Sequence, residues 1–225
     1  MRKWILLFLT VILLGLVVGD GVARSWAESQ LAERAAAYYP PGAGSSASIH
    51  SFPFVGRLLV SGSIPRVDVN LDELRIETVL VRRLSIQASD VQLSRRELFQ
   101  GRVHLYDIGR GKIVATVDGP SLARAAGVDM RFAPGEVSIH RHVGGADVSA
   151  RGKVAVKGNV VTFTPISVEG LAVPAGTFTA VSYRLPGVQI LPCQADVTII
   201  QDGIVLSCTI TDVPPALVQA AQSQP

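Results

Sequence analysis

Two histidines separated by one residue are the best candidates for metal chemistry in this chain of 225 residues. His140 and His142 fall in a segment that alternates like a strand, so both side chains project from one face. A metal would need a third ligand, and Asp147 is the nearest carboxylate in sequence. The two histidines lie on the polar parity, opposite Val137 and Ile139, which favours solvated surface residues. We therefore expect no metal site and no cofactor.

Catalytic motifs are also missing from the sequence. It contains no G-x-S-x-G, H-E-x-x-H, P-loop or G-x-G-x-x-G pattern. Gly109-Arg110-Gly111 resembles half of a nucleotide-binding loop, but a strand pattern follows it, which favours a turn. Carboxylates such as Asp68, Asp72 and Glu73 are spread along polar strand faces and form no acid–base pair. We predict no catalytic residue and no enzyme activity.

Cys193 and Cys208 are the only cysteines. Outside the cytoplasm, two cysteines favour a disulfide. A two-residue turn at Asp202-Gly203 would leave them four residues out of register, about 13 Å along a strand, which is too far for a bridge. Pro192 could bend the chain back and close that gap. A disulfide between Cys193 and Cys208 and two buried free thiols are both open interpretations.

The composition predicts a folded, strand-rich protein. Hydrophobic residues make up 48% and charged residues 17% of the chain, which excludes a disordered protein. Aromatics are few, and Val, Ile and Leu carry the apolar content, which favours β-structure. A net charge of +3 gives no support to nucleic-acid binding. Arginine far outnumbers lysine, which suits phosphate headgroups but also fits a bias in genomic base composition.

An apolar run opens the chain and predicts export. Arg2 and Lys3 precede an uncharged run over 4–19, and Asp20 is the first charge after it. This order is typical of a signal peptide, with cleavage after Ala23, or of an uncleaved membrane anchor. The basic start keeps the N-terminus inside, so the remaining chain lies outside the cytoplasm in both cases.

We therefore divide the chain into a signal or anchor helix over 1–23 and a single β-rich domain over 24–225. As an anchor, the segment would set Trp4 and Trp26 at the two interfacial belts of the membrane.

A helix followed by long antiparallel strands is the predicted architecture. Residues 24–39 are rich in Ala, Glu and Leu and predict a helix, and a Pro/Gly/Ser break over 40–46 follows. From Ala47 onward the hydrophobic period is two, and its phase flips at Ser89-Asp90, which predicts a β-bulge or a turn. The strands are expected around 67–72, 80–93, 103–105, 113–117, 137–143, 148–156, 160–164, 177–183, 195–201 and 204–211, and short helices over 54–61, 120–126 and 214–222.

Each predicted strand has one apolar face, which must be buried. The cover could be a second sheet, the sheet's own curled surface or the N-terminal helix.

Several segments resemble an actinobacterial family of envelope proteins, the LmeA-like phospholipid-binding proteins. The basic start, apolar run and Ala-rich helix follow the family's order. Residues 49–59 contain Phe52-Pro53-Phe54 and Leu58-Leu59, which resemble its Phe-Pro-Phe and Leu-Leu element. The segments 64–69 and 115–122 are also similar, and the resemblance covers roughly 25–212.

This resemblance implies a fold akin to the tubular lipid-binding superfamily. The fold class is then α+β, with an N-terminal apolar anchor and a long helix packed against a strongly curved, mostly antiparallel sheet that leaves an apolar groove for acyl chains. The family is linked to phospholipid binding, including phosphatidylinositol, and to lipoglycan assembly in the cell envelope. The expected partners are phospholipid and membrane, without nucleic acid.

The Phe-Pro-Phe element and the residues after it are the candidate lipid site. We expect aromatic and aliphatic side chains at the groove entrance and Arg57 near a headgroup; plain core packing of the two phenylalanines is the alternative. The Arg82-Arg83 and Arg95-Arg96 pairs could meet phosphates or form solvated strand ends. The lipid-binding candidates are Phe52, Phe54, Val55, Arg57, Leu58 and Leu59.

The predicted function is non-catalytic binding or transfer of phospholipid at the outer face of the cytoplasmic membrane. The alternative is an anchored β-rich scaffold that docks envelope enzymes without binding lipid. A third hypothesis, a hydrolase or transferase acting on envelope glycolipids, lacks a catalytic motif to support it.

Overall fold

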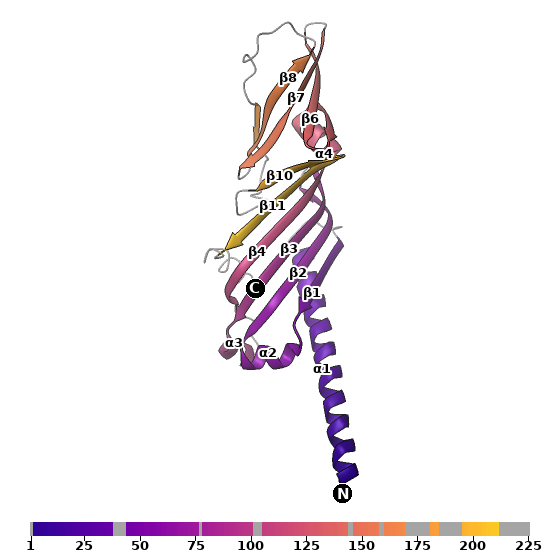
Figure 1. Cartoon of the computed structure of the whole chain (residues 1–225), viewed down its shortest axis with the longest axis vertical. Helices are drawn as coiled ribbons and strands as arrows, with labels where there is room; N and C mark the ends of the chain where they lie inside the picture. Colours follow the sequence, from indigo (N-terminus) through magenta and orange to yellow (C-terminus); the bar gives the residue numbers. More distant parts are fainter. Residues whose placement is uncertain are drawn as a thin grey trace.

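The computed structural model shows one long helix and two antiparallel sheets stacked end to end (Figure 1). It describes residues 2–37, 44–76, 78–100, 105–143, 146–157, 160–169, 181–184 and 195–211. The helix predicted over 214–222 and the start of the strand predicted over 177–183 lie outside the described residues.

Helix α1 (Arg2–Ala37) joins the apolar run and the Ala-rich segment into one continuous helix. Its 36 residues span about 54 Å, and its N-terminal half projects beyond the sheets (Figure 1). The side chains of α1 are described from Leu14 onward. Within the described part of the chain, no helix is long and apolar enough to cross a membrane.

The strands form two antiparallel sheets joined through a short helix. The larger sheet has the order β1-β2-β3-β4-β11-β10, and the smaller has the order β5-β6-β7-β8-β9. The larger sheet contains β1 (Gly44–His50), β2 (Ser63–Ile76), β3 (Val79–Leu93), β4 (Leu105–Asp118), β10 (Asp196–Ile200) and β11 (Gly203–Thr211). The smaller contains β5 (Asp129–Ala133), β6 (Glu136–Val143), β7 (Ala146–Lys157), β8 (Val160–Glu169) and β9 (Val181–Arg184), and the short helices are α2 (Phe54–Val60), α3 (Arg95–Phe99) and α4 (Gly119–Ala126).

The predicted α+β class and the predicted packing of the N-terminal helix on antiparallel strands are confirmed. The prediction of a single, strongly curved sheet is wrong. The strands belong to two sheets, neither of which is strongly curled (Figure 1). The strands divide into two sheets at α4, which ends at Gly127 in the left-handed conformation, with φ of 66°. The chain leaves the larger sheet there, builds the smaller sheet, and returns through β10 and β11.

The register of the larger sheet separates an apolar face from a polar one. Ala47, Val69, Ile86 and Ile113 pair across four consecutive strands and therefore share one face. The residues next to them in sequence, such as Lys112, pair on the opposite face, because side chains alternate along a strand.

The predicted bulge or turn at Ser89-Asp90 is wrong. β3 continues through these residues without a register shift, and Asp90 has a positive φ of 55°. Glu73 in β2 has a φ of 57°, and Leu71 and Leu74 on either side of it are both buried. At both places the apolar pattern changes phase at a residue with a positive φ, so the change follows from local backbone conformation and not from an inserted residue.

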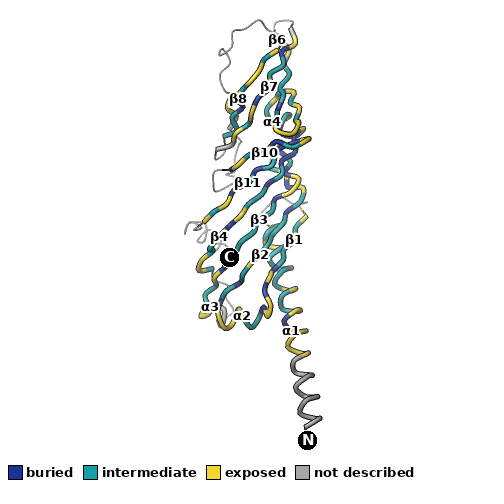
Figure 2. The backbone as a smooth tube through the Cα atoms, viewed as in Figure 1, coloured by how far each residue is buried: buried dark blue, intermediate teal, exposed yellow. Residues whose placement is uncertain are grey.

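The main hydrophobic core lies where the two sheets meet, close to α4 (Figure 2). It combines Leu71 and Leu206 of the larger sheet with Val137 and Phe163 of the smaller one. A side chain at Gly119 would meet the ring of Phe132 at 2.5 Å, so only glycine fits there.

Asp118 joins three elements at this core. One carboxylate oxygen, Oδ1, accepts from Nε and Nη2 of Arg82 at 2.9 and 2.5 Å. The other, Oδ2, accepts the N–H of Ser121 at 2.9 Å and so caps α4. The Ser121 hydroxyl in turn accepts the N–H of Leu80 at 2.9 Å. Strand β3, strand β4 and α4 are therefore held by one buried carboxylate.

The predicted hairpin between β10 and β11 is confirmed, but its turn lies one residue earlier than expected. Ile200 pairs with Gly203, so Gln201 and Asp202 form the turn. If this register is extended, residue 195 lies opposite Cys208. Cys193 is then about two residues out of register with Cys208, instead of the expected four. Cys208 is disulfide-bonded. Cys193 lies outside the described residues, so the pairing of the two cysteines stays a prediction.

Asp118 predicts a pH dependence of stability. Burial raises the pKa of its carboxyl, but hydrogen bonds from Arg82 and Ser121 outweigh burial, and the pKa lies below the ordinary value for aspartate. The stability it contributes is therefore present above the unfolded-state pKa of about 3.9 and is lost as the pH falls through the lower folded-state pKa. Asp118→Asn should unfold at lower urea concentration at pH 7 and lose less stability on acidification, whereas the exposed Asp129→Asn should follow the wild type. Parallel acid profiles for wild type and Asp118→Asn would contradict this role.

Candidate functional site

The predicted lipid-site residues gather around α2, at one end of the larger sheet and beside α1 (Figure 1). The first N–H groups of a helix have no partner within it, and the residue before α2 is Pro53, which offers no side-chain cap. Asp20 of α1 supplies the cap: the N–H of Phe54 donates to its Oδ2 at 2.8 Å, and the N–H of Val55 to its Oδ1 at 2.7 Å. The carboxylate is buried, and it fixes α2 against α1.

Phe54 belongs to a second, smaller hydrophobic cluster rather than to an open surface. It is buried with Ile49, Ile64 and Val91, which come from β1, β2 and β3. Val55 and Leu58 are partly buried against this cluster, together with Ala23 and Ala27 of α1. The small alanine side chains leave room for α1 to lie close to the sheet.

The other apolar candidates are exposed. Phe52 is 66% accessible and Leu59 is about half accessible, and Arg57 on the same helix is also exposed. Val60, which the sequence analysis did not select, is 76% accessible. The α2 end therefore presents three large apolar side chains and a cation to the exterior, which is uncommon without a binding partner.

Helix α3 lies next to α2. Arg95 donates through Nη1 to the carbonyl oxygen of Val60 at 2.8 Å, and the N–H of Leu93 donates to the carbonyl oxygen of Gly62 at 2.7 Å. The Arg95-Arg96 pair is thus at the α2 end. Arg82 and Arg83 form ion pairs within the protein, with Asp118 and Asp72 respectively.

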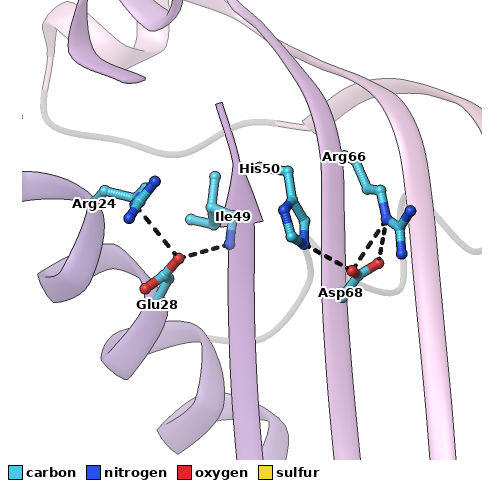
Figure 3. A network of polar contacts seen from close by, with 6 residues as sticks. All are labelled: Arg24, Glu28, Ile49, His50, Arg66 and Asp68. Carbon is cyan, nitrogen blue, oxygen red and sulfur yellow. Dashed lines mark hydrogen bonds and ion pairs between the residues drawn. The ribbon is translucent and has the colours of Figure 1, made fainter. Parts of the chain in front are cut away.

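A polar network ties α1 to the edge of the larger sheet (Figure 3). The N–H of Ile49, in edge strand β1, donates to Oε1 of Glu28 at 2.7 Å, and Arg24 lies 3.7 Å from the same oxygen. Satisfying an outward N–H in this way protects the edge strand.

On the polar face of the sheet, Asp68 joins β1 and β2 (Figure 3). Its carboxylate accepts from Nε of Arg66 at 2.9 Å and lies 2.9 Å from Nε2 of His50. The hydrogen bond from Arg66 is the main cause that lowers the pKa of Asp68. This group is a structural link between strands, because every partner in it is already engaged.

A stripe of partly exposed aliphatic residues crosses the larger sheet beside the main hydrophobic core, and two of its members, Ile86 and Ile113, pack against that core. The row Ala47, Val69, Ile86 and Ile113 crosses β1 to β4 on the apolar face, and all four side chains are only partly buried. Val69 belongs to neither cluster. We call this row the aliphatic stripe.

The apolar groove implied by the resemblance is not shown by the described residues. A shallow, open hollow is lined by Val18, Gly21, Val22, Ser25, Trp26 and Ser29, all from one face of α1. Residues of a single helix do not enclose a ligand.

One member of the histidine pair contacts the carboxylate that is nearest in sequence. His142 lies 2.7 Å from Oδ1 of Asp147 through Nδ1, in an exposed contact across β6 and β7. Within the described part of the chain, no three potential ligands come together.

Comparison with known proteins identifies the family. A family model described as LmeA-like phospholipid-binding matches residues 18–220. The chain belongs to this family. No curated protein and no solved structure matches it.

The resemblance seen in the sequence is therefore confirmed, and the family name implies phospholipid as the ligand of this LmeA-like protein. The structure brings Phe52, Phe54, Val55, Arg57, Leu58 and Leu59 together around α2. Their role in lipid binding stays a prediction, as does the division of the LmeA-like chain at residue 23.

Asp20 should be a main determinant of how α2 is placed. Asp20→Ala removes both acceptors and should cost about 1.5–3 kcal/mol, the range for hydrogen bonds to charged groups, which lowers Tm by several degrees in a domain of this size. Asp20→Asn keeps one acceptor and should have a smaller effect, and the exposed Asp196→Ala should have none. Thermal unfolding followed by circular dichroism measures this order. Equal Tm values for wild type and Asp20→Ala would exclude the proposed clamp.

Proposed function

We propose that this LmeA-like protein binds phospholipid without catalysing a reaction, at the outer face of the cytoplasmic membrane, in support of lipid and lipoglycan assembly in the cell envelope. The observation that carries the proposal is the aliphatic stripe: a partly exposed apolar row on the larger sheet of a chain from a phospholipid-binding family.

Acyl chains would lie along the apolar face of the larger sheet. Val69, Ile86 and Ile113 offer aliphatic contact without a polar group that needs a partner. Each CH₂ group that such a surface removes from water contributes about 0.8 kcal/mol. A chain of ordinary length therefore gains substantial affinity without any catalytic residue.

The headgroup would lie at the α2 end. Phe54 and Leu58 form a wall of the smaller cluster, and Phe52 and Leu59 stand at its exposed margin. Arg57 is exposed beside them, and a guanidinium can bond two phosphate oxygens at once. This arrangement gives the predicted site residues two roles: the buried ones shape the entrance, and the exposed ones meet the ligand.

The N-terminal segment would hold the protein at the membrane. The run over 4–19 is uncharged and apolar, and it belongs to the part of α1 that projects from the sheets (Figure 1). Leu14, Leu16, Val17 and Val18 of this helix are exposed, and apolar surface of this extent needs a cover. A lipid-binding domain on such an anchor would exchange phospholipid with the adjacent leaflet.

Bulky substitutions on the aliphatic stripe test lipid binding. Ile113→Trp fills the space beside the stripe, whereas the neighbouring Val114→Trp places the same bulky side chain on the polar face. Solvent extraction and native mass spectrometry of the purified full chain should find phospholipid with wild type and Val114→Trp, and several-fold less with Ile113→Trp. Wild type that carries no phospholipid, or equal lipid content in the two variants, would contradict the proposal and leave the scaffold hypothesis.

A further inference from the structure

The end of the protein that carries α2 and α3 has a second property, which concerns the membrane surface rather than a single bound lipid. Its exposed side chains are Phe52, Leu59 and Val60, with Arg57 on α2 and Arg96 on α3. We call this set the α2 tip. Large apolar residues beside arginines are typical of surfaces that enter the headgroup region of a membrane.

The position of the α2 tip relative to α1 is fixed by Asp20. This residue is the first charge after the apolar run over 4–19, so it marks the point on α1 where the run ends. The N–H groups of Phe54 and Val55 donate to it at 2.8 and 2.7 Å. The beginning of α2 therefore lies at the level where the apolar run ends, and it cannot leave that level without breaking both hydrogen bonds.

Exposed apolar side chains occur on α1 both before and after Asp20. On α1 it includes Leu16, Val17, Val22 and Trp26, which are all exposed. Trp26 follows Asp20 by six residues, about 9 Å along the helix axis, and tryptophan is enriched at membrane interfaces. A bilayer that takes up the N-terminal half of α1 would reach the α2 tip with its headgroup layer.

The charge of the α2 tip suits an anionic membrane. Helices α2 and α3 together contain three arginines and one glutamate, Glu97. Arg95 is placed by its hydrogen bond to the carbonyl oxygen of Val60, so the two helices present their cations together. An anionic membrane surface attracts such cations.

We infer that the α2 tip is a membrane-docking surface that inserts into the headgroup layer of an anionic phospholipid bilayer. It holds the larger sheet upright on the bilayer. The inference rests on the proposed insertion of the N-terminal segment, but not on the presence of lipid along the stripe.

A spin label at the α2 tip tests the docking directly. The full chain carrying Val60→Cys, labelled with a nitroxide, is placed in vesicles of phosphatidylcholine and phosphatidylglycerol. Ile166→Cys is the matched control, because Ile166 is 67% exposed, against 76% for Val60, and lies on β8 at the opposite end of the molecule (Figure 1). The label at 60 should be accessible to oxygen and several-fold less accessible to a water-soluble nickel chelate than the label at 166.

A further labelled sample separates docking from its alternatives. A label at Leu9→Cys reports insertion of the apolar run itself. A lipid-accessible label at 9 with a water-accessible label at 60 overturns the docking alone, and water-accessible labels at both overturn the proposed anchoring as well. Phospholipid content measured by extraction is a separate readout of the lipid site.

The charges and the nature of the partner are tested in the same system. Arg57→Glu combined with Arg96→Glu should restore access of the nickel chelate to the label at 60, and so should high salt, which screens surface charges. If protection at 60 instead rises with the ratio of protein to lipid, another protein molecule covers the tip and the docking surface is excluded.

Discussion

The contact between the Asp20 carboxylate and the first two N–H groups of α2 is the interaction on which the functional end of this protein depends. A short helix that begins after a proline has no cap of its own, and a carboxylate from α1 supplies it. The positive end of the helix dipole favours that negative charge. Since Asp20 also ends the apolar run, one interaction sets the distance between that run and the first residues of the candidate lipid site.

A second constraint is the need to cover one face of the larger sheet. Two clusters meet this need at the two ends: α1 and α2 pack on β1 to β3, and α4 with the smaller sheet packs on the other end. The aliphatic stripe is only partly buried, although Ile86 and Ile113 pack against the main core. A row of aliphatic side chains that stays partly exposed is what makes lipid binding physically reasonable. The polar groups around Asp118 and around Asp68 are satisfied by internal partners.

Some features could be predicted because they depend on local sequence. Gly127 ends α4 as expected, since glycine adopts the left-handed conformation without steric cost. The alternation along β2 and β4 gave their faces correctly, and the Phe-Pro-Phe element marked the start of α2. The turn of the last hairpin lies one residue earlier than expected because Gly203 pairs within β11, where a side chain would collide with the backbone oxygen of Val117, and Asp202 adopts the positive φ in the turn. Edge strand β1 begins at Gly44, inside the predicted break, because pairing with β2 and the Glu28 contact stabilise a segment of weak β-propensity.

The sequence by itself determined the helix followed by one-faced strands, the apolar start, the family and the residues that gather around α2. Each of these follows from hydrophobic period or from a short motif, which act over a few residues. Only the tertiary structure decided that the strands divide into two sheets, that Phe54 is buried while Phe52 and Val60 are exposed, and that Asp20 caps a helix that begins 34 residues later. These outcomes depend on which distant segments of the chain meet. The residue pattern of a short segment does not reveal the free energy of such long-range contacts.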